Sequence, residues 1–405
     1  MAREKRRSAP KAPRGPHARL AKPLERAVAE GHPWVFRDAL GAVRGRPGEV
    51  ATLLDRKGRF LARGVLERGP IGFRVWTLED EPVGAALVAR RIAEARALRA
   101  LVVGPETSAY RLVNGEGDRM PGLTVDLYGD EESGRRVAVL RIDGAVGGNG
   151  AIREALDEAL RGLGVDALLV RDPRGDADAK VQPAWGEAPR RVVVRERGMQ
   201  LVADLLAGQK TGLFLDHRVS RARVRELAEG RRVLNLYAYT GGFSVAAGLG
   251  GARHVTTVDV APGAIGLADE SWVANGLDPA AHRALAADVP TFLNDAGRAR
   301  WDLVVADPPS FAPSRKARRN ALRAYAKLHE SGLEHLEDEG LYLAASCSSH
   351  VPHDDFAETL REGARRARCA VQILDRWGAA PDHPRLAAFP EGDYLSVVLA
   401  RKLPR

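Results

Sequence analysis

Two polar residues in the C-terminal half of the sequence follow apolar runs. Asp307 closes Trp301-Asp-Leu-Val-Val-Ala, and Cys347 is separated by one serine from the end of Leu341-Tyr-Leu-Ala-Ala. Two prolines follow the acid, and because proline fixes φ and lacks a backbone donor, they stiffen its exit from the run. If both runs are strands of one parallel sheet, their ends lie at the same edge. The pattern therefore predicts a thiol and a rigidly held carboxylate in one site.

Such a pair could methylate carbon 5 of cytosine. This carbon is a poor nucleophile, but addition of a thiolate to carbon 6 makes it enamine-like, which is covalent catalysis. Asp307 would hydrogen-bond or protonate ring nitrogen 3, and a base would remove the carbon 5 proton after methyl transfer. We therefore predict Cys347 and Asp307 as catalytic residues. The plainer alternatives are that Cys347 is a small buried residue and that Asp-Pro-Pro is only a turn. Cys369, in an Arg-rich stretch, is expected to be structural.

An apolar run from Val233 leads into Tyr239-Thr-Gly-Gly-Phe, and a second run, Val255-Thr-Thr-Val, ends at Asp259. Strand, glycine turn, helix and strand with a terminal acid is the pattern of a nucleoside site, in which the acid accepts both ribose hydroxyls. The third glycine of a dinucleotide fingerprint and the Lys-Ser/Thr of a P-loop are both missing, so a pyrophosphate ligand fits poorly. The pattern favours S-adenosylmethionine as the cofactor. Asp288 could accept from the adenine amino group, or could be an ordinary helix N-cap.

The elements that must position these residues divide the chain of 405 residues into four parts. Residues 1–18 are expected to be a disordered basic arm, because they contain almost no large apolar residue. Short strands split by Gly and Pro predict a small β-barrel in 19–77, and strands with two helices predict a central α/β domain in 78–190. Alternating strands and helices in 191–405 predict a doubly wound α/β domain.

The net charge of +9 is concentrated near the N-terminus, where residues 1–75 hold 18 Lys and Arg against 7 Asp and Glu. Clustered positive charge is the electrostatic footprint of a nucleic acid partner, although a solubilising Arg-rich surface has the same composition. No apolar run is long enough for a membrane span and no secretory leader is visible, so we expect no membrane partner and a cytoplasmic location. Two cysteines are too few for a four-cysteine metal site, and we predict no metal.

The motifs together resemble the bacterial large-subunit ribosomal RNA cytosine-5 methyltransferases that carry an N-terminal PUA domain. The resemblance covers nearly the whole chain after the arm. It is carried by Gly31-His-Pro-Trp-Val-Phe, Asn114-Gly-Glu-Gly-Asp-Arg-Met-Pro-Gly-Leu-Thr-Val-Asp, Gln209-Lys-Thr-Gly-Leu-Phe-Leu-Asp-His-Arg, Tyr239-Thr-Gly-Gly-Phe, Asp307-Pro-Pro-Ser-Phe, Ser346-Cys-Ser and Asp382-His-Pro…Phe389-Pro-Glu-Gly-Asp-Tyr-Leu.

The resemblance implies an N-terminal PUA barrel, a small central α/β domain and a Rossmann-like class I methyltransferase domain. It also implies S-adenosylmethionine as cofactor and 23S ribosomal RNA as partner, with residues 210–216 closing over the cofactor. The cofactor-binding residues expected from the motifs are Lys210, Thr211, Phe214, Tyr239, Thr240, Gly241, Gly242, Asp259, Asp288 and Asp307. The expected substrate-binding residues are Pro308, Pro309, Ser310, Phe311, Arg315, Lys316, Arg318, Arg319 and Tyr325, although a solvated helix face would explain the four basic residues equally well.

The chain departs from the family pattern at two positions, both expected near the substrate. Ser310 replaces the usual lysine after the two prolines, and His329 stands four residues after Tyr325, where asparagine is frequent. These departures leave the target nucleotide open. The sequence also does not decide whether the substrate is naked RNA or a ribosomal particle, or whether the chain forms a homodimer. The rival functions are methylation of a guanine or adenine nitrogen without a cysteine, an RNA-binding ribosome-assembly factor, and a protein or small-molecule methyltransferase.

Overall fold

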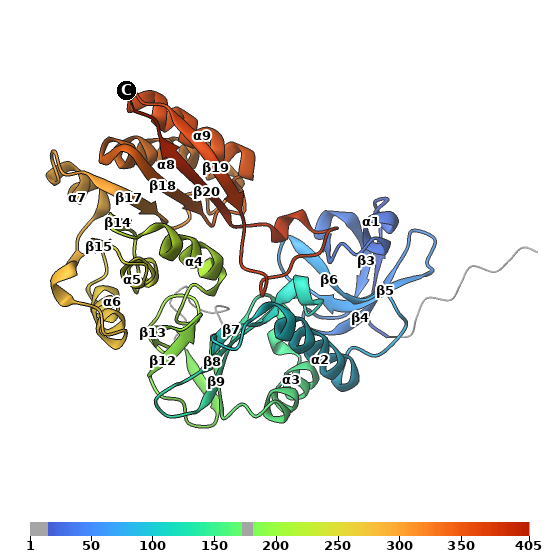
Figure 1. Cartoon of the computed structure of the whole chain (residues 1–405). Coiled ribbons are helices and arrows are strands. Elements are labelled where there is room, and N and C mark those ends of the chain that lie inside the picture. The colour runs from blue at the N-terminus through green and yellow to red at the C-terminus, as the bar shows by residue number, and fades with distance from the viewer. Residues whose placement is uncertain (1–14, 172–180, 405) are drawn as a thin grey trace, which may run out of the picture.

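The computed structural model describes residues 15–171 and 181–404, which contain sheets of six, five, two and seven strands (Figure 1). The six-stranded sheet is formed near the N-terminus, the five-stranded sheet in the centre of the sequence, and the seven-stranded sheet in the C-terminal half. The two-stranded hairpin lies in the sequence between the last two. The fold class is therefore α/β with an N-terminal unit that is mainly β, as predicted.

The N-terminal sheet has the strand order β2-β6-β5-β4-β1-β3. Four of its five pairs of neighbouring strands are antiparallel, and the fifth pair, β1 with β4, is parallel. Most of the predicted basic arm lies outside the described residues, but its end was placed too late, because His17 and Ala18 already pair with β3 and β4. The bounds are β1 (His17–Leu20), α1 (Glu25–Ala29), β2 (Trp34–Phe36), β3 (Leu40–Arg44), β4 (Val50–Leu54), β5 (Phe60–Leu66) and β6 (Ile71–Thr77).

The central sheet has the order β11-β10-β9-β8-β7, and helices α2 and α3 pack against one of its faces. Its strands are apolar on both faces because the opposite face packs on the β12–β13 hairpin. The bounds are α2 (Ala85–Val102), β7 (Ala109–Asn114), β8 (Leu123–Gly129), β9 (Arg136–Ile142), α3 (Gly150–Gly162), β10 (Ala167–Arg171), β11 (Gln182–Trp185), β12 (Arg191–Glu196) and β13 (Met199–Asp204).

The seven-stranded sheet has the order β16-β15-β14-β17-β18-β20-β19, and only β20 runs antiparallel to its neighbours. The order reverses between β14 and β17, which is where a doubly wound sheet opens a crevice for a ligand. The bounds are α4 (Arg218–Leu227), β14 (Arg232–Leu236), α5 (Gly242–Leu249), β15 (His254–Asp259), α6 (Pro262–Ala274), β16 (His282–Ala286), α7 (Val289–Asp295), β17 (Trp301–Ala306), α8 (Arg318–Glu334), β18 (Leu336–Ser346), α9 (His353–Arg366), β19 (Val371–Trp377) and β20 (Ser396–Lys402).

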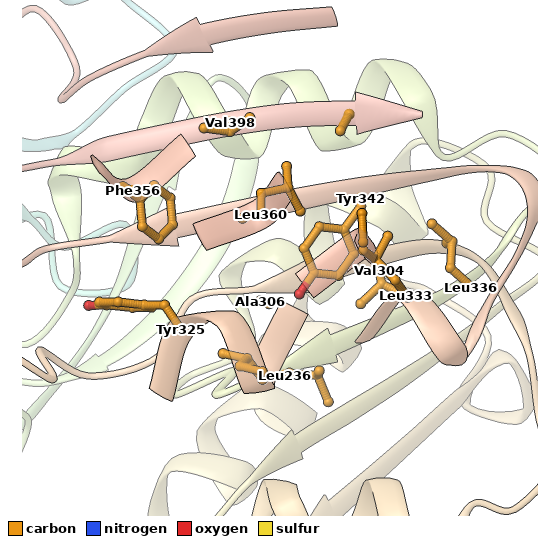
Figure 2. Packing of buried hydrophobic residues seen from close by; sticks show 14 of the residues in the cluster. Leu236, Val304, Ala306, Tyr325, Leu333, Leu336, Tyr342, Phe356, Leu360 and Val398 are labelled. Atoms are coloured by element: carbon orange, nitrogen blue, oxygen red, sulfur yellow. The ribbon is translucent and has the colours of Figure 1, made fainter. Parts of the chain in front are cut away.

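Helices α8 and α9 cover one face of this sheet and bury its largest apolar cluster. Figure 2 shows part of this cluster, with Tyr325 and Phe356 from these helices and Tyr342 and Val304 from the strands. All four side chains are fully buried. Burial of an aromatic or branched side chain contributes about 1.5–3 kcal/mol, so this cluster stabilises the packing of α8 and α9 on β17 and β18. None of the helices in the described part of the chain has the length and apolar character that a bilayer crossing requires.

A C-terminal segment, residues 378–395, connects all three parts of the molecule (Figure 1). The Asp382 carboxylate lies 2.6 Å from the guanidinium of Arg218 and accepts the backbone N–H of Arg111 at 3.0 Å. Further along, the Phe389 ring meets the Trp34 ring edge to face, with centroids 4.6 Å apart. The segment thus ties α4 to the central sheet and then to the N-terminal sheet.

Candidate functional site

A cleft of about 400 Å³ opens at the carboxyl ends of β14, β15, β17 and β18. Its position is dictated by the strand order, because the two halves of the sheet send their helices to opposite faces at this point. The lining residues are Leu201, Gln209, Lys210, Leu213, Phe214, His217, Arg221, Tyr237, Ala238, Tyr239, Thr240, Gly242, Phe243, Asp259, Val260, Asp288, Val289, Asp307, Pro308, Pro309, Ser310 and Cys347.

The turn from β14 into α5 brings the backbone to the cleft in a strained conformation. Tyr237, Tyr239 and Gly241 all have positive φ, of 57°, 48° and 72°. For the two tyrosines this left-handed conformation is unfavourable and is typical of functional sites. Gly241 does not line the cleft; a Cβ there would lie 2.5 Å from the Cβ of Ala268, so its role is to let α5 approach α6.

Two carboxylates border the same half of the cleft. Asp259 accepts the backbone N–H groups of Tyr239 at 2.8 Å and Ala261 at 2.9 Å, so the protein holds it as an oriented acceptor. Asp288 caps α7 by accepting from the backbone N–H and hydroxyl of Thr291, at 3.1 and 2.8 Å. Because Asp288 also lines the cleft, the N-cap alternative and a ligand contact are compatible.

The segment after β13 also lines the cleft. Lys210 donates to Asp216 at 3.0 Å, and its ammonium lies 4.1 Å from the centre of the Phe214 ring. Phe214 in turn meets Tyr239 edge to face. The structure does not bring Thr211 to the cleft, contrary to expectation: its hydroxyl is buried and bonds to Asp126 and Tyr128 of the central sheet. Neighbouring residues of a tight loop point in opposite directions, which the sequence motif could not resolve.

Asp307 leaves the end of β17 and keeps 18% of its side chain exposed in the cleft. Its Oδ2 lies 3.2 Å from Nε2 of the buried His217. On the other side of the imidazole, Nδ1 lies 3.3 Å from the hydroxyl of Ser220, which accepts from the indole N–H of Trp377 at 2.9 Å. The motif acid thus contacts a side chain of the turn before α4, which is in turn linked to side chains of α4 and β19.

Cys347 follows the end of β18 and faces the same cleft as Asp307. Burial raises the pKa of its thiol, and the negative charge of Asp307 raises this pKa further, while Lys210 lowers it. The structure thus brings together the thiol and the acid that the sequence placed at neighbouring strand ends. A raised pKa means that the thiolate needs a base or a bound ligand to form near neutral pH.

Hydroxyl groups hold the loop on both sides of Cys347. Tyr325 bonds to Ser348 at 2.8 Å and accepts from Ser346 at 2.9 Å, and Ser348 bonds to Ser310 at 2.9 Å. Ser310 therefore joins the Asp-Pro-Pro loop to the cysteine loop. Tyr325 was expected to contact substrate, but it is fully buried in the core, where it can only position the cysteine loop.

The other residues expected near the substrate divide into a group that packs toward the core and an exposed basic group. Phe311 packs on Tyr325 instead of lining the cleft. The four basic residues just before and at the start of α8 are exposed, with Arg318 paired to Asp355. His329 is fully buried, and burial lowers its pKa to about 3. It packs behind Tyr325 and not next to a substrate, because the α8 face on which both lie turns toward the sheet. The exposed group is Arg315, Lys316, Arg318 and Arg319.

We expect the raised pKa of Cys347 to appear in its alkylation rate. With Cys369 replaced by alanine, iodoacetamide modification of Cys347 should rise with pH along a midpoint above that of a cysteine peptide, because only the thiolate reacts. Asp307→Asn should move the midpoint downward, since it removes a negative charge that opposes the thiolate. Mass spectrometry of the alkylated peptide measures this. A midpoint at or below the peptide value would contradict it.

Sequence reasoning missed His217, Arg221 and Val260 as cleft residues. His217 stood within the quoted motif of residues 209–218, but its type alone gave no partner. Arg221 lies one helical turn after it and donates to Glu196 from two of its three guanidinium nitrogens, Nε and Nη2, each at 2.6 Å. Only the position of Val260 directly after Asp259 signalled a role at the cleft.

Two family models match the chain. Residues 164–392 match an S-adenosylmethionine-dependent methyltransferase model, and residues 18–78 match a PUA-like domain. A protein of Deinococcus radiodurans named ribosomal RNA large subunit methyltransferase is 37% identical over 400 residues, covering 94% of this chain and 96% of the relative. A ribosomal RNA large subunit methyltransferase I of Tolumonas auensis is 34% identical, covering 95% and 98%. A solved structure of a putative methyltransferase from Streptococcus mutans superposes with a TM-score of 0.83 at 25% identity, covering 95% and 99%.

Proposed function

Because the chain belongs to the family of S-adenosylmethionine-dependent ribosomal RNA large subunit methyltransferases, we propose that it methylates carbon 5 of a cytosine in 23S ribosomal RNA. One observation carries the choice of atom: Cys347 and Asp307 share one cleft with the carboxylate of Asp259. An enzyme that methylates a ring or exocyclic nitrogen needs the acid but has no use for a thiol at that place.

The cleft residues fit S-adenosylmethionine. Asp259 is held by two backbone N–H groups with its carboxylate at the cleft, where it can accept both hydroxyls of a ribose. Asp288 can accept from the adenine amino group, and Thr240 and Gly242 border the space for the amino acid part. We assign Lys210 and Phe214 to the cover over this ligand, and we assign Gly241 to the turn that leaves room for it.

Bound S-adenosylmethionine supplies an electrophilic methyl group. Sγ of the Cys347 thiolate bonds to carbon 6 of cytosine, the C5–C6 π electrons move into the C4–C5 bond, and the C4–N3 π electrons move to nitrogen 3. Asp307 stabilises that nitrogen by a hydrogen bond or a proton. The C4–C5 π electrons would then form the bond from carbon 5 to the methyl group, the methyl–sulfur bond of the cofactor would break with its electrons left on sulfur, and the nitrogen 3 electrons would re-form the C4–N3 double bond. A base finally takes the carbon 5 proton, the C5–C6 double bond re-forms, and the C6–S electrons leave with the thiolate.

We expect Asp259→Ala to weaken binding of S-adenosylmethionine by about 10–100-fold. Hydrogen bonds to a charged group contribute about 1.5–3 kcal/mol, and each 1.4 kcal/mol is tenfold in affinity. Isothermal titration with S-adenosylhomocysteine measures the change. Asp269→Ala, an exposed acid on α6, is the matched control and should bind as the unchanged protein does. Equal affinity of the two variants would contradict the assignment.

We assign RNA recognition to two surfaces. The first is the PUA-like domain, which we place at residues 19–77 and which carries much of the positive charge. The second is the exposed basic group that follows Asp307-Pro-Pro-Ser-Phe, where Arg315, Lys316 and Arg319 can contact phosphates beside the reaction site. Pro308, Pro309 and Ser310 border the space left for the base. An RNA partner of this kind places the enzyme in the cytoplasm with the ribosome.

Mapping of ribosomal RNA tests the proposal directly. Bisulfite sequencing and mass spectrometry of 23S RNA from cells with and without the gene should reveal one cytosine that loses its carbon 5 methyl group. A lost methyl group on a guanine or adenine nitrogen would replace the proposal with the nitrogen class. Unchanged RNA would leave the assembly-factor alternative.

A further inference from the structure

A line of side-chain contacts leads from the surface of β19 to the acid of the cleft. It begins at the indole N–H of Trp377, passes through the hydroxyl of Ser220 and the imidazole of His217, and ends at Oδ2 of Asp307. The first two contacts are hydrogen bonds of 2.9 and 3.3 Å, and the third is an ion-pair contact that brings Nε2 of His217 to 3.2 Å from Oδ2 of Asp307. These residues come from β19, α4, the turn before α4, and the end of β17.

The direction of this line follows from its first member. An indole N–H can only donate, so it occupies an acceptor position of the Ser220 oxygen. The Ser220 hydrogen is then free to point at Nδ1 of His217, which leaves the imidazole hydrogen on Nε2, facing Asp307. The opposite tautomer would set a lone pair of Nε2 against a carboxylate oxygen.

Packing fixes the imidazole in place. The His217 side chain is 3% exposed, and its ring meets Phe243 with centroids 5.4 Å apart. The two cations nearby are engaged elsewhere, since Lys210 donates to Asp216 and Arg221 to Glu196. The group that contacts the Asp307 carboxylate directly is therefore the imidazole of His217.

We propose that His217 is a positioning residue for methyl transfer: by donating from Nε2 to Oδ2 it fixes the Asp307 carboxylate so that Oδ1 is presented to the target base. The inference rests on the proposed role of Asp307 at the base, which the nitrogen class shares. It does not depend on Cys347.

The test compares His217→Leu with His217→Gln in the full-length enzyme. Leucine fills the space without a donor, whereas the glutamine amide can still donate to Asp307. We expect the single-turnover rate of His217→Leu to fall about 10²-fold, the usual effect of misplacing a reacting group by about 1 Å. His217→Gln should return to within about tenfold of the unchanged enzyme. Affinity for S-adenosylhomocysteine should be the same in all three proteins.

Two further variants examine the start of the line and the specificity of the effect. Trp377→Phe keeps the ring but removes the indole N–H, and should lower the rate about 3–10-fold, the value of one neutral hydrogen bond. His335→Gln, which alters a buried histidine that bonds to Ser331 at the end of α8, is the matched control and should turn over normally.

An unchanged rate in His217→Leu would overturn the inference. Equal losses in the leucine and glutamine variants, together with a lower melting temperature, would also overturn it, because they would indicate a structural role. The identity of the methylated atom in the product separates this result from the proposed function. A methyl group on a ring nitrogen would refute carbon 5 chemistry, while the ratio of leucine to glutamine rates would still decide the role of His217.

Discussion

Cys347→Ala should lose methyl transfer by about 10⁴-fold or more while binding S-adenosylhomocysteine with unchanged affinity. The loss is this large because a covalent route has no substitute for its nucleophile, and removal of such residues costs on the order of 10⁴–10⁶. Cofactor affinity is retained because the carboxylates of Asp259 and Asp288 border the other half of the cleft. Single-turnover transfer of a labelled methyl group to ribosomal RNA measures the rate, and isothermal titration measures the affinity.

Cys369→Ala is the matched control, because Cys369 lies beyond the end of α9 and packs against the core under α8 and α9. It should retain full turnover. A second readout uses RNA in which the target carries 5-fluorocytosine. A fluorine at carbon 5 cannot leave as a proton, so the adduct should persist and a denaturant-stable complex should form through the peptide that contains Cys347. Full turnover in Cys347→Ala would move the assignment to a ring or exocyclic nitrogen.

Asp307→Ala should lower the methyl-transfer rate by about 10²–10⁴-fold, the range for removal of a positioned acid or base. The rate should fall even though the pKa of Cys347 moves back toward its usual value, since the thiolate would gain population but lose the stabilised ring nitrogen. Binding of 23S RNA should change less than about twofold, because the basic residues at the start of α8 stay in place. Filter binding and single-turnover kinetics measure the two quantities.

The same variant separates an enzyme from an assembly factor. Cells that produce only Asp307→Ala should lose the methyl group while their large ribosomal subunits sediment normally. A defect in subunit assembly equal to that of the gene deletion, with methylation of RNA intact, would favour the assembly role. The variant therefore distinguishes an enzyme from an assembly factor by experiment.

Much of the fold could be predicted because its strands are short apolar runs between glycines, prolines and charges. The apolar runs that begin at Val233, Val255 and Trp301 start within one residue of β14, β15 and β17. β18 begins five residues earlier than expected, at Leu336, because the positive φ of Glu339 lets its first residues pair with β17 across an irregular register. The β12–β13 hairpin could not be predicted in the same way, because its turn contains no glycine pair and no proline.

Strand ends were the reliable guide to the cleft. Asp259, Asp307 and Cys347 could be predicted because the carboxyl ends of parallel strands converge at one edge. The positions of the Tyr325 and Thr211 side chains could not be predicted, because each residue lies on a helix or loop whose side-chain direction depends on what it packs against. His217 required a partner 90 residues away in the sequence, and no local pattern encodes such a contact.

The segment that carries Asp382 and Phe389 makes the three parts of this molecule poor candidates for exchange. The N-terminal unit contributes Trp34 to a ring contact and Arg74 to an ion pair with Glu116 of the central unit, and both partners would be left exposed or unpaired by its removal. Loss of activity after deletion of residues 1–76 would therefore mix lost RNA contacts with a damaged scaffold. A chimera that borrows this unit from a relative must borrow residues 378–395 with it. Because residues 378–395 contact both the N-terminal unit and the C-terminal domain, we expect these two parts to be inherited together.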